Sequence, residues 1–258
     1  MTTSVLAALI FGIAGWPDEG ALHSQSAPEA TARAAFLFSY RPKPGKQALF
    51  DEGYRRHLTW HARMKDPLVW YAWYVTTGDR LGLFIDGSFG ASFDAFDKRV
   101  DPEADAADFA QTAGDFADDV SRSVYRLRPD LSTSQALEDR APTSTIEVTY
   151  FLLEPGHERQ FEAALAGLRA ADASPSAGPH YTWYQLVVGD EQPSYMLMIH
   201  RQGWSDYGHV GTEISHIPGI VSGEQGAREL ENTLEQSVRR MWSETWNYRD
   251  DLSLVPEG

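Results

Sequence analysis

Three side chains that could take part in chemistry recur along one stretch of the sequence. Tyr54, His57 and His61 are spaced three and four residues apart, which places them on one face of an α-helix. An imidazole near its unperturbed pKa exchanges protons at neutral pH, so His57 and His61 are candidate catalytic bases. The alternative is that both histidines are structural and hydrogen-bond to backbone or water.

His57 and His61 also have the spacing at which two imidazoles on a helix bind one metal ion. In the corresponding zinc protease motif a glutamate follows the first histidine, but here that position is Leu58. The spacing of the remaining residues indicates no third ligand. We therefore expect no metal site.

Aromatic residues are abundant in the apolar stretches and could line a pocket for a flat ligand. We predict a ligand-binding site formed by Tyr54, His57, His61 and Trp73. The alternative is that Trp73 and its aromatic neighbours simply fill the core. Ser-His-Asp, phosphate-loop and dinucleotide-binding motifs are absent from the sequence, so no motif identifies a reaction.

An internal repeat supplies the elements that would position these side chains. An offset of 111 residues (156 − 45) aligns Pro44-Gly45 with Pro155-Gly156, Phe50 with Phe161, and Gly78-Asp79 with Gly189-Asp190. The same offset places His57 on Leu168, which belongs to an apolar helical face in the second copy. We therefore expect His57 to point inward, into the space between helix and sheet.

Each copy has the predicted order β-α-β-β-α-β. The predicted strands cover residues 35–40, 69–77 and 81–86 in the first copy, and 146–153, 180–188 and 195–200 in the second. A long helical stretch then runs through Phe109, Phe116 and Val120, or through Leu230, Leu234, Val238 and Met241, before a short final strand. The fold class we predict is α+β, with two tandem ferredoxin-like units at 33–133 and 145–258 and a linker at 134–144. Strands that are aromatic on both faces favour packing of the two sheets against each other, as an intrachain pseudo-dimer or α+β barrel.

The chain resembles the dimeric α+β barrel superfamily, and most nearly its antibiotic biosynthesis monooxygenase-like branch. The resemblance rests on the Pro-Gly turn and the following Phe, the Trp-Tyr strand and the Gly-Asp hairpin of each copy, and it covers nearly all of residues 35–253. It implies a ligand site between helix and sheet. Because this superfamily includes cofactor-independent monooxygenases, haem-degrading and haem-binding members, and isomerase-like proteins, the resemblance does not fix an activity.

We predict that the protein binds a small apolar or aromatic molecule in the helix-sheet cleft of the first unit. One alternative is a cofactor-independent monooxygenase or isomerase in which His57 or His61 is the base, and another is a structural protein without a pocket. We expect no cofactor, with haem as a minor variant, and either a monomer or a homodimer. A formal net charge of −15 argues against nucleic acid as a partner, and the absence of cysteine excludes disulfides and thiolate metal sites.

Residues 1–32 are predicted to be a leader. The apolar run from Val5 to Gly15 has the length of a signal-peptide core and is too short to span a bilayer, and Ser24 and Ser26 suit cleavage after Ser26. We expect a periplasmic or secreted protein without an integral membrane segment in the mature chain; the alternative is an N-terminal extension of a cytoplasmic protein. The intact mass of protein from its native host tests this expectation, and a full-length mass would contradict it.

Overall fold

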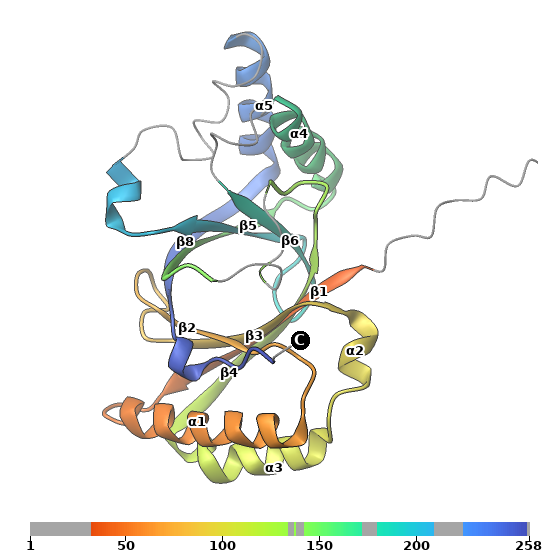
Figure 1. The fold of residues 1–258 in the computed structure, drawn as a ribbon. Coiled ribbons are helices and arrows are strands. Elements are labelled where there is room, and N and C mark those ends of the chain that lie inside the picture. Colours follow the sequence, from red (N-terminus) through yellow and green to blue (C-terminus); the bar gives the residue numbers. More distant parts are fainter. Residues whose placement is uncertain (1–31, 134–136, 138–141, 172–179, 209–223, 257–258) are drawn as a thin grey trace, which may run out of the picture. The chain divides into compact units, whose positions relative to one another are not determined.

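The computed structural model describes residues 32–133, 137, 142–171, 180–208 and 224–256 (Figure 1). The predicted leader up to residue 31 and most of the predicted linker lie outside these ranges. The described residues from Ala32 onward belong to one compact unit.

The order β-α-β-β-α-β recurs in the two halves. The first half contains β1 (Arg33–Pro42), α1 (Gln47–Met64), β2 (Tyr71–Val75), β3 (Phe84–Ser92), the short α2 (Phe93–Asp97), α3 (Pro102–Thr112) and β4 (Ala117–Leu127). The second half contains β5 (Thr145–Leu153), α4 (Glu158–Ala171), β6 (Tyr181–Val188), β7 (Ser194–Arg201), α5 (Glu224–Ser237) and β8 (Val238–Tyr248). The predicted α+β class is confirmed.

The eight strands form one closed barrel in the order β1-β3-β2-β8-β5-β7-β6-β4. Antiparallel pairing of β2 with β8 and of β4 with β6 joins the two halves. Helices α1 and α3 cover the outside of the first half, and α4 and α5 cover the second (Figure 1). The predicted α+β barrel is therefore confirmed, and closure leaves no unpaired sheet edge.

Two apolar clusters in the first half explain why its strands are hydrophobic on both faces. Strand β2 is buried at all five of its positions, because one face lies inside the barrel and the other lies under the helices. Trp73 belongs to the cluster inside the barrel, whereas Tyr74 packs with Phe50 and Phe84 beneath α1. The alternation of side chains along the strand thus decides which aromatic residues can reach the helix-sheet layer.

The predicted long helices end earlier than expected. Helix α3 ends at Thr112 and β4 begins at Ala117, so Val120 lies in a strand; Val238 and Met241 likewise lie in β8. Each final strand is 11 residues long because it pairs both with its own half and with the other half. The Gly-Asp hairpins are as predicted, with positive φ at Gly78 and Gly189.

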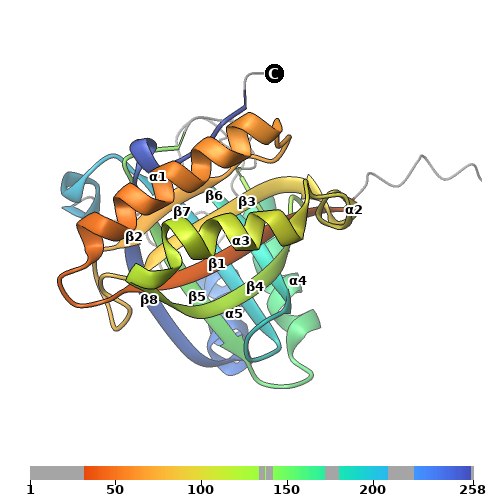
Figure 2. The same ribbon diagram turned by 90° about the horizontal axis from the view of Figure 1, so that it is seen from below.

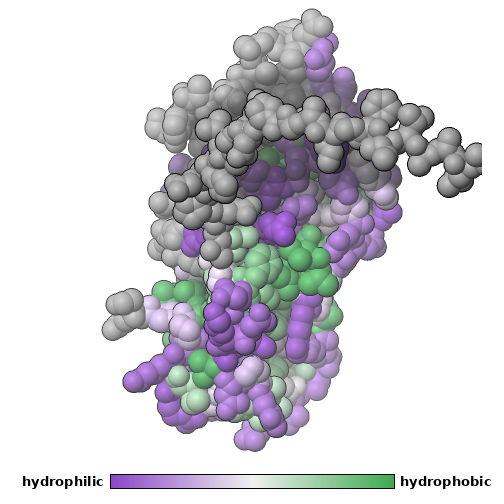
Figure 3. All heavy atoms as spheres, turned by 90° about the vertical axis from the view of Figure 1, so that its right-hand side faces the viewer, coloured by the Kyte–Doolittle hydropathy of each residue, from purple (hydrophilic) through white to green (hydrophobic). Residues whose placement is uncertain are grey.

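The described part of the chain contains no helix that is both long and apolar enough to cross a membrane. Figure 3 shows one face of the molecule, on which hydrophilic side chains surround a limited hydrophobic area. A surface of this mixed kind is ordinary for a folded domain.

Candidate functional site

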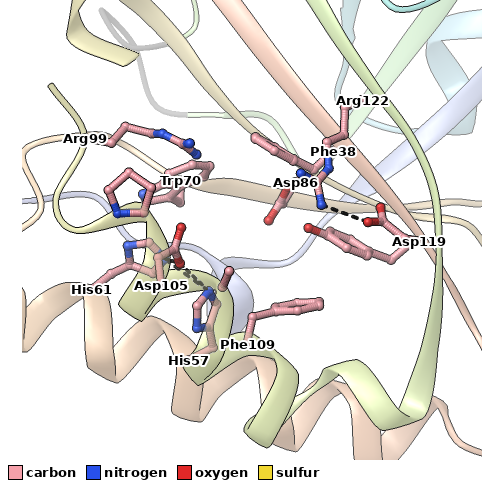
Figure 4. Close-up of a pocket in the computed structure, with 13 residues that line it drawn as sticks. Phe38, His57, His61, Trp70, Asp86, Arg99, Asp105, Phe109, Asp119 and Arg122 are labelled. Carbon is pink, nitrogen blue, oxygen red and sulfur yellow. Dashed lines mark hydrogen bonds and ion pairs between the residues drawn. The ribbon is translucent and has the colours of Figure 1, made fainter. Parts of the chain in front are cut away.

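A cavity of about 200 Å³ lies between α1, α3 and the outer face of the first half's sheet. It is lined by Phe38, Tyr40, His57, His61, Trp70, Asp86, Arg99, Pro102, Asp105, Ala106, Phe109, Asp119 and Arg122. Figure 4 shows His57, His61 and Asp105 together on the helix side, with Asp86 and Arg122 on the sheet side. The pocket therefore combines aromatic walls with charged groups from both layers.

Three polar side chains meet on the helix side of this pocket. Nε2 of His57 lies 3.2 Å from Nε2 of His61. Oδ1 of Asp105 lies 3.2 Å from Nε2 of His57 and 3.3 Å from Nε2 of His61. Both imidazoles are about 95% buried. One carboxylate oxygen and two imidazole nitrogens thus converge on a single point.

Each imidazole is held from its other nitrogen by a second carboxylate. Nδ1 of His57 lies 2.9 Å from Asp108, and Nδ1 of His61 lies 2.7 Å from Asp66. Asp66 also accepts hydrogen bonds from the backbone N–H of Leu68 and from the indole N–H of Trp70, both at 2.9 Å. A carboxylate at Nδ1 fixes the orientation of each ring, so that Nε2 faces the convergence point.

The end of α1 and the start of α3 position these carboxylates. Lys65, directly after α1, adopts a left-handed conformation with φ of 56°, and the backbone N–H of Asp66 then donates to the carbonyl of His61. This turn brings Asp66 back against the last turn of α1. At the start of α3, the Asp101 side chain accepts a hydrogen bond from the N–H of Ala104, which caps the helix.

Helix α3 brings Asp105 and Asp108 to the face that looks toward α1, because residues three apart lie on the same side of a helix. Figure 2 shows α1 and α3 lying side by side across the strands. The two helices lie very close at Gly53, where an added Cβ would lie 2.1 Å from the carbonyl oxygen of Thr112. A glycine at this position is what allows the two backbones to come so near.

The carboxylates determine the charge of this cluster. Burial by itself lowers the pKa of His61, but hydrogen bonds with Asp105 and Asp66 outweigh it and raise the pKa to about 9. Burial raises the pKa of Asp105, yet the hydrogen bonds from His57 and His61 hold it well below its usual range. At neutral pH His61 therefore stays protonated and Asp105 ionised, which makes His61 an acid rather than the base that we expected.

A second titratable group lies on the sheet side of the pocket. Asp86, in β3, is 5% exposed, and its Oδ2 accepts a hydrogen bond from the hydroxyl of Tyr54. Among the described residues its other oxygen, Oδ1, is buried and has no hydrogen-bond partner. Burial raises the pKa of Asp86, while the hydrogen bond from Tyr54 and the nearby histidines lower it by a smaller amount. The resulting pKa is about 7.

Two arginines complete the polar lining. Arg122 pairs with Asp119 at 2.8 Å and is largely exposed. Arg99 lies after α2, and its Nε is buried without a hydrogen-bond partner in the part of the chain that the structure covers. A buried donor of this kind is costly unless something supplies an acceptor.

The structure brings together part of the predicted site. His57 is buried and faces the pocket as predicted, with His61 beside it, although the side chain of Leu168 lies outside the described residues. Tyr54 lies behind the pocket and reaches it through Asp86. Trp73 is on the opposite face of the sheet, inside the barrel against Trp246 and Phe89, so its place in the predicted site was wrong.

Several residues of the site had no signal that sequence reasoning used. Asp105 and Asp108 look like an ordinary solvated helix face, and Arg99 stands in a short loop. Asp86 did offer a signal, since it ends the otherwise apolar run LGLFID. Asp105 also supplies the third potential metal ligand that spacing did not indicate.

Comparison with known proteins identifies the fold. No family model and no curated protein sequence matches the chain. A structure of a protein assigned as a monooxygenase from Lactobacillus acidophilus NCFM matches with a TM-score of 0.53 at 10% identity, over 86% of this chain and 95% of that one. An anthrone oxidase-like protein matches at 0.53 and 12% identity, over 86% and 92%, and a protein assigned as a chlorite dismutase at 0.54 and 12%, over 86% and 96%. The chain therefore has the dimeric α+β barrel fold.

These neighbours correct our expectation that no cofactor takes part. Chlorite dismutases appear among them, including one from Candidatus Nitrospira defluvii at a TM-score of 0.51 and 7% identity. Haem is the cofactor to which these chlorite dismutase neighbours point, so the expectation of no cofactor was wrong.

Proposed function

We propose that the pocket binds a small aromatic molecule carrying an acidic oxygen, a carboxylate or a phenolate, and that the protein exchanges a proton with it through Asp86. The observation that carries this proposal is a pair of buried polar atoms on the pocket wall, Nε of Arg99 and Oδ1 of Asp86, which have no hydrogen-bond partner among the described residues. Native proteins rarely leave such atoms unpaired, and a ligand is one of the ways to satisfy them.

The chemistry of the walls defines the ligand class. Phe38, Trp70 and Phe109 offer ring faces and edges to a planar apolar group. Arg99 supplies a cationic donor for an acidic oxygen, and charge-assisted hydrogen bonds of this kind are the strong ones. A cavity of about 200 Å³ favours a single ring over a large polycyclic molecule.

Asp86 is suited to proton exchange with that ligand. A carboxyl group that titrates near neutral pH can both accept and donate a proton under working conditions, which is the requirement for acid-base catalysis. Burial produces this tuning here, as the raised pKa of Asp86 indicates. Shifted acids in clefts are typical of active sites.

Haem, by contrast, does not fit the pocket as the described residues form it. The cavity volume of about 200 Å³ lies below the roughly 300–1,000 Å³ of sites for drug-sized ligands. Haem is at least as large as such ligands, so its site needs a larger volume than this cavity has. Both Nε2 atoms also point at each other and at Asp105, so neither imidazole presents a free nitrogen to the open space.

Oxidation of the bound ligand is a second candidate function. A protein assigned as a monooxygenase and an anthrone oxidase-like protein share the fold, and a phenolic ligand deprotonated by Asp86 would be more easily oxidised. Consumption of dissolved oxygen during ligand titrations would support it.

Paired probes test the binding proposal. We expect calorimetric titration in the presence of a chelator to show that benzoate binds more tightly than methyl benzoate, because the ester lacks the anionic oxygens. Replacing Arg99 by Gln should weaken benzoate binding about 10- to 100-fold, which corresponds to the loss of one hydrogen bond to a charged group. Binding of methyl benzoate should not change.

Arg63→Gln is the matched control, because Arg63 is an exposed arginine in the last turn of α1 and does not line the pocket. It should bind both probes as the wild type does. Equal affinity of the wild type and Arg99→Gln for benzoate would rule out Arg99 as the anchor and with it the proposed ligand class.

A further inference from the structure

The convergence of His57, His61 and Asp105 has the dimensions of a metal site. The three facing atoms form a nearly equilateral triangle with edges of 3.2, 3.2 and 3.3 Å. An ion that binds all three corners with tetrahedral angles would lie about 2.0 Å from each, which matches Zn–N and Zn–O bond lengths of roughly 2.0–2.2 Å. The three atoms already lie at these distances, and such an ion would displace the protons that they share.

The surroundings of the triangle also match a metal site. Metal-binding imidazoles usually donate their other N–H to a carboxylate, and Asp108 and Asp66 stand at these positions for His57 and His61. Asp66 is itself fixed by Leu68 and Trp70, and its side chain is 3% exposed. Three carboxylates around two imidazoles give a negative charge that a divalent cation would offset.

We propose that His57, His61 and Asp105 bind one divalent transition-metal ion of the zinc or ferrous class, with its open coordination position facing the pocket. Two nitrogen donors and one carboxylate suit these ions, whereas Mg²⁺ and Ca²⁺ prefer sites made of oxygen. The site stands on its own donor geometry and does not depend on the identity of the pocket's ligand.

The three proposed metal ligands come from both helices of the α1–α3 pair. The two histidines come from consecutive turns of α1, and the carboxylate comes from the first turns of α3. Because Asp105 also lines the pocket, an ion held there would lie next to a bound molecule and could accept one of its oxygens as a further ligand.

Metal titration of the full chain tests the proposal. After treatment with a chelator and its removal, we expect one Zn²⁺ per chain with a rise in Tm, and Co²⁺ to give the visible absorption bands of a site with nitrogen and oxygen donors. Asp105→Asn and His61→Gln should each lower Zn²⁺ affinity at least about 100-fold. Asp66→Asn, which removes the carboxylate that holds His61 but none of the three metal-binding atoms, should lower it about 10- to 100-fold.

His180→Gln is the matched control, since His180 is an exposed histidine outside the cluster; it should bind Zn²⁺ as the wild type does. Mg²⁺ should not compete. The Co²⁺ spectrum is recorded on the wild type, so it remains informative if a variant fails to fold. One-to-one Zn²⁺ binding unaffected by Asp105→Asn and His61→Gln, or no Zn²⁺ binding by the wild type, would overturn the site. If added hemin gave a Soret band and His61→Gln abolished it, His61 would be a haem ligand, and the proposed metal ion would be wrong.

Discussion

Replacing Gly53 by Ala should lower the free energy of unfolding by roughly 3 kcal/mol, the upper part of the usual range for overpacking. The added Cβ would lie 2.1 Å from the carbonyl oxygen of Thr112 and 2.9 Å from Cα of Ala113. Both neighbours are backbone atoms that cannot rotate away, so α1 and α3 must move apart. Alanine normally stabilises a helix by about 1 kcal/mol relative to glycine. A loss of stability in Gly53→Ala would therefore have to come from the clash between the two helices.

Denaturant unfolding at 25 °C measures this effect, and the second half offers the control. The repeat offset of 111 residues places Gly53 on Ala164, which is buried in α4. Ala164→Gly should cost about 1 kcal/mol through helix propensity, together with its lost methyl contact. A Gly53→Ala variant as stable as the wild type would show that the two helices are not held at this distance. Because Asp105 and Asp108 come from α3, the same variant should also bind Zn²⁺ more weakly.

The sequence predicted the fold well where local chemistry and pattern agree. Glycines with positive φ end the hairpins, and the alternation of strands and helices within each repeat gives the order of elements. The lengths of the last strands could not be predicted in this way. They depend on pairing between the two halves, so residues such as Val120 and Met241, which look helical by spacing, belong to strands.

The sequence predicted the candidate site only on α1, where the spacing of the histidines was visible. His57 and His61 share a helical face, and the repeat marked that face as inward. Asp105 is more than forty positions further along, and only the packing of α3 on α1 brings it to the histidines. Trp73 was misplaced for a different reason: when both faces of a strand are apolar, the period of two cannot tell which face meets the helices.

Replacing Asp86 by Asn should make the protein more stable at neutral pH. The ordinary pKa of this carboxyl is 3.8, and burial raises it to about 7 in the folded protein. Between these values the folded state keeps a proton that the unfolded chain has released, so the contribution of Asp86 to stability falls as the pH rises from 4 to 7. Three pKa units correspond to about 4 kcal/mol.

The difference between the unfolding free energies of Asp86→Asn and the wild type should therefore be near zero at pH 4, rise through pH 7 and level off above it. Asparagine has no charge to bury, and its carbonyl can still accept the hydrogen bond from Tyr54. His61, whose pKa is raised to about 9, titrates in both proteins, so its contribution largely cancels in the difference. Measuring both in a chelator keeps the metal content equal.

Asp118→Asn is the control, because Asp118 is an exposed carboxylate whose side chain is 69% accessible; its difference curve should be flat. A flat curve for Asp86→Asn as well would mean that Asp86 ionises normally in the folded protein and cannot serve as the group that exchanges protons near neutral pH. A rising curve would show that the protein retains a destabilising carboxyl at the pocket wall. A residue kept at that cost to stability is expected to act on the ligand. The stabilised Asp86→Asn variant should therefore no longer exchange a proton with it.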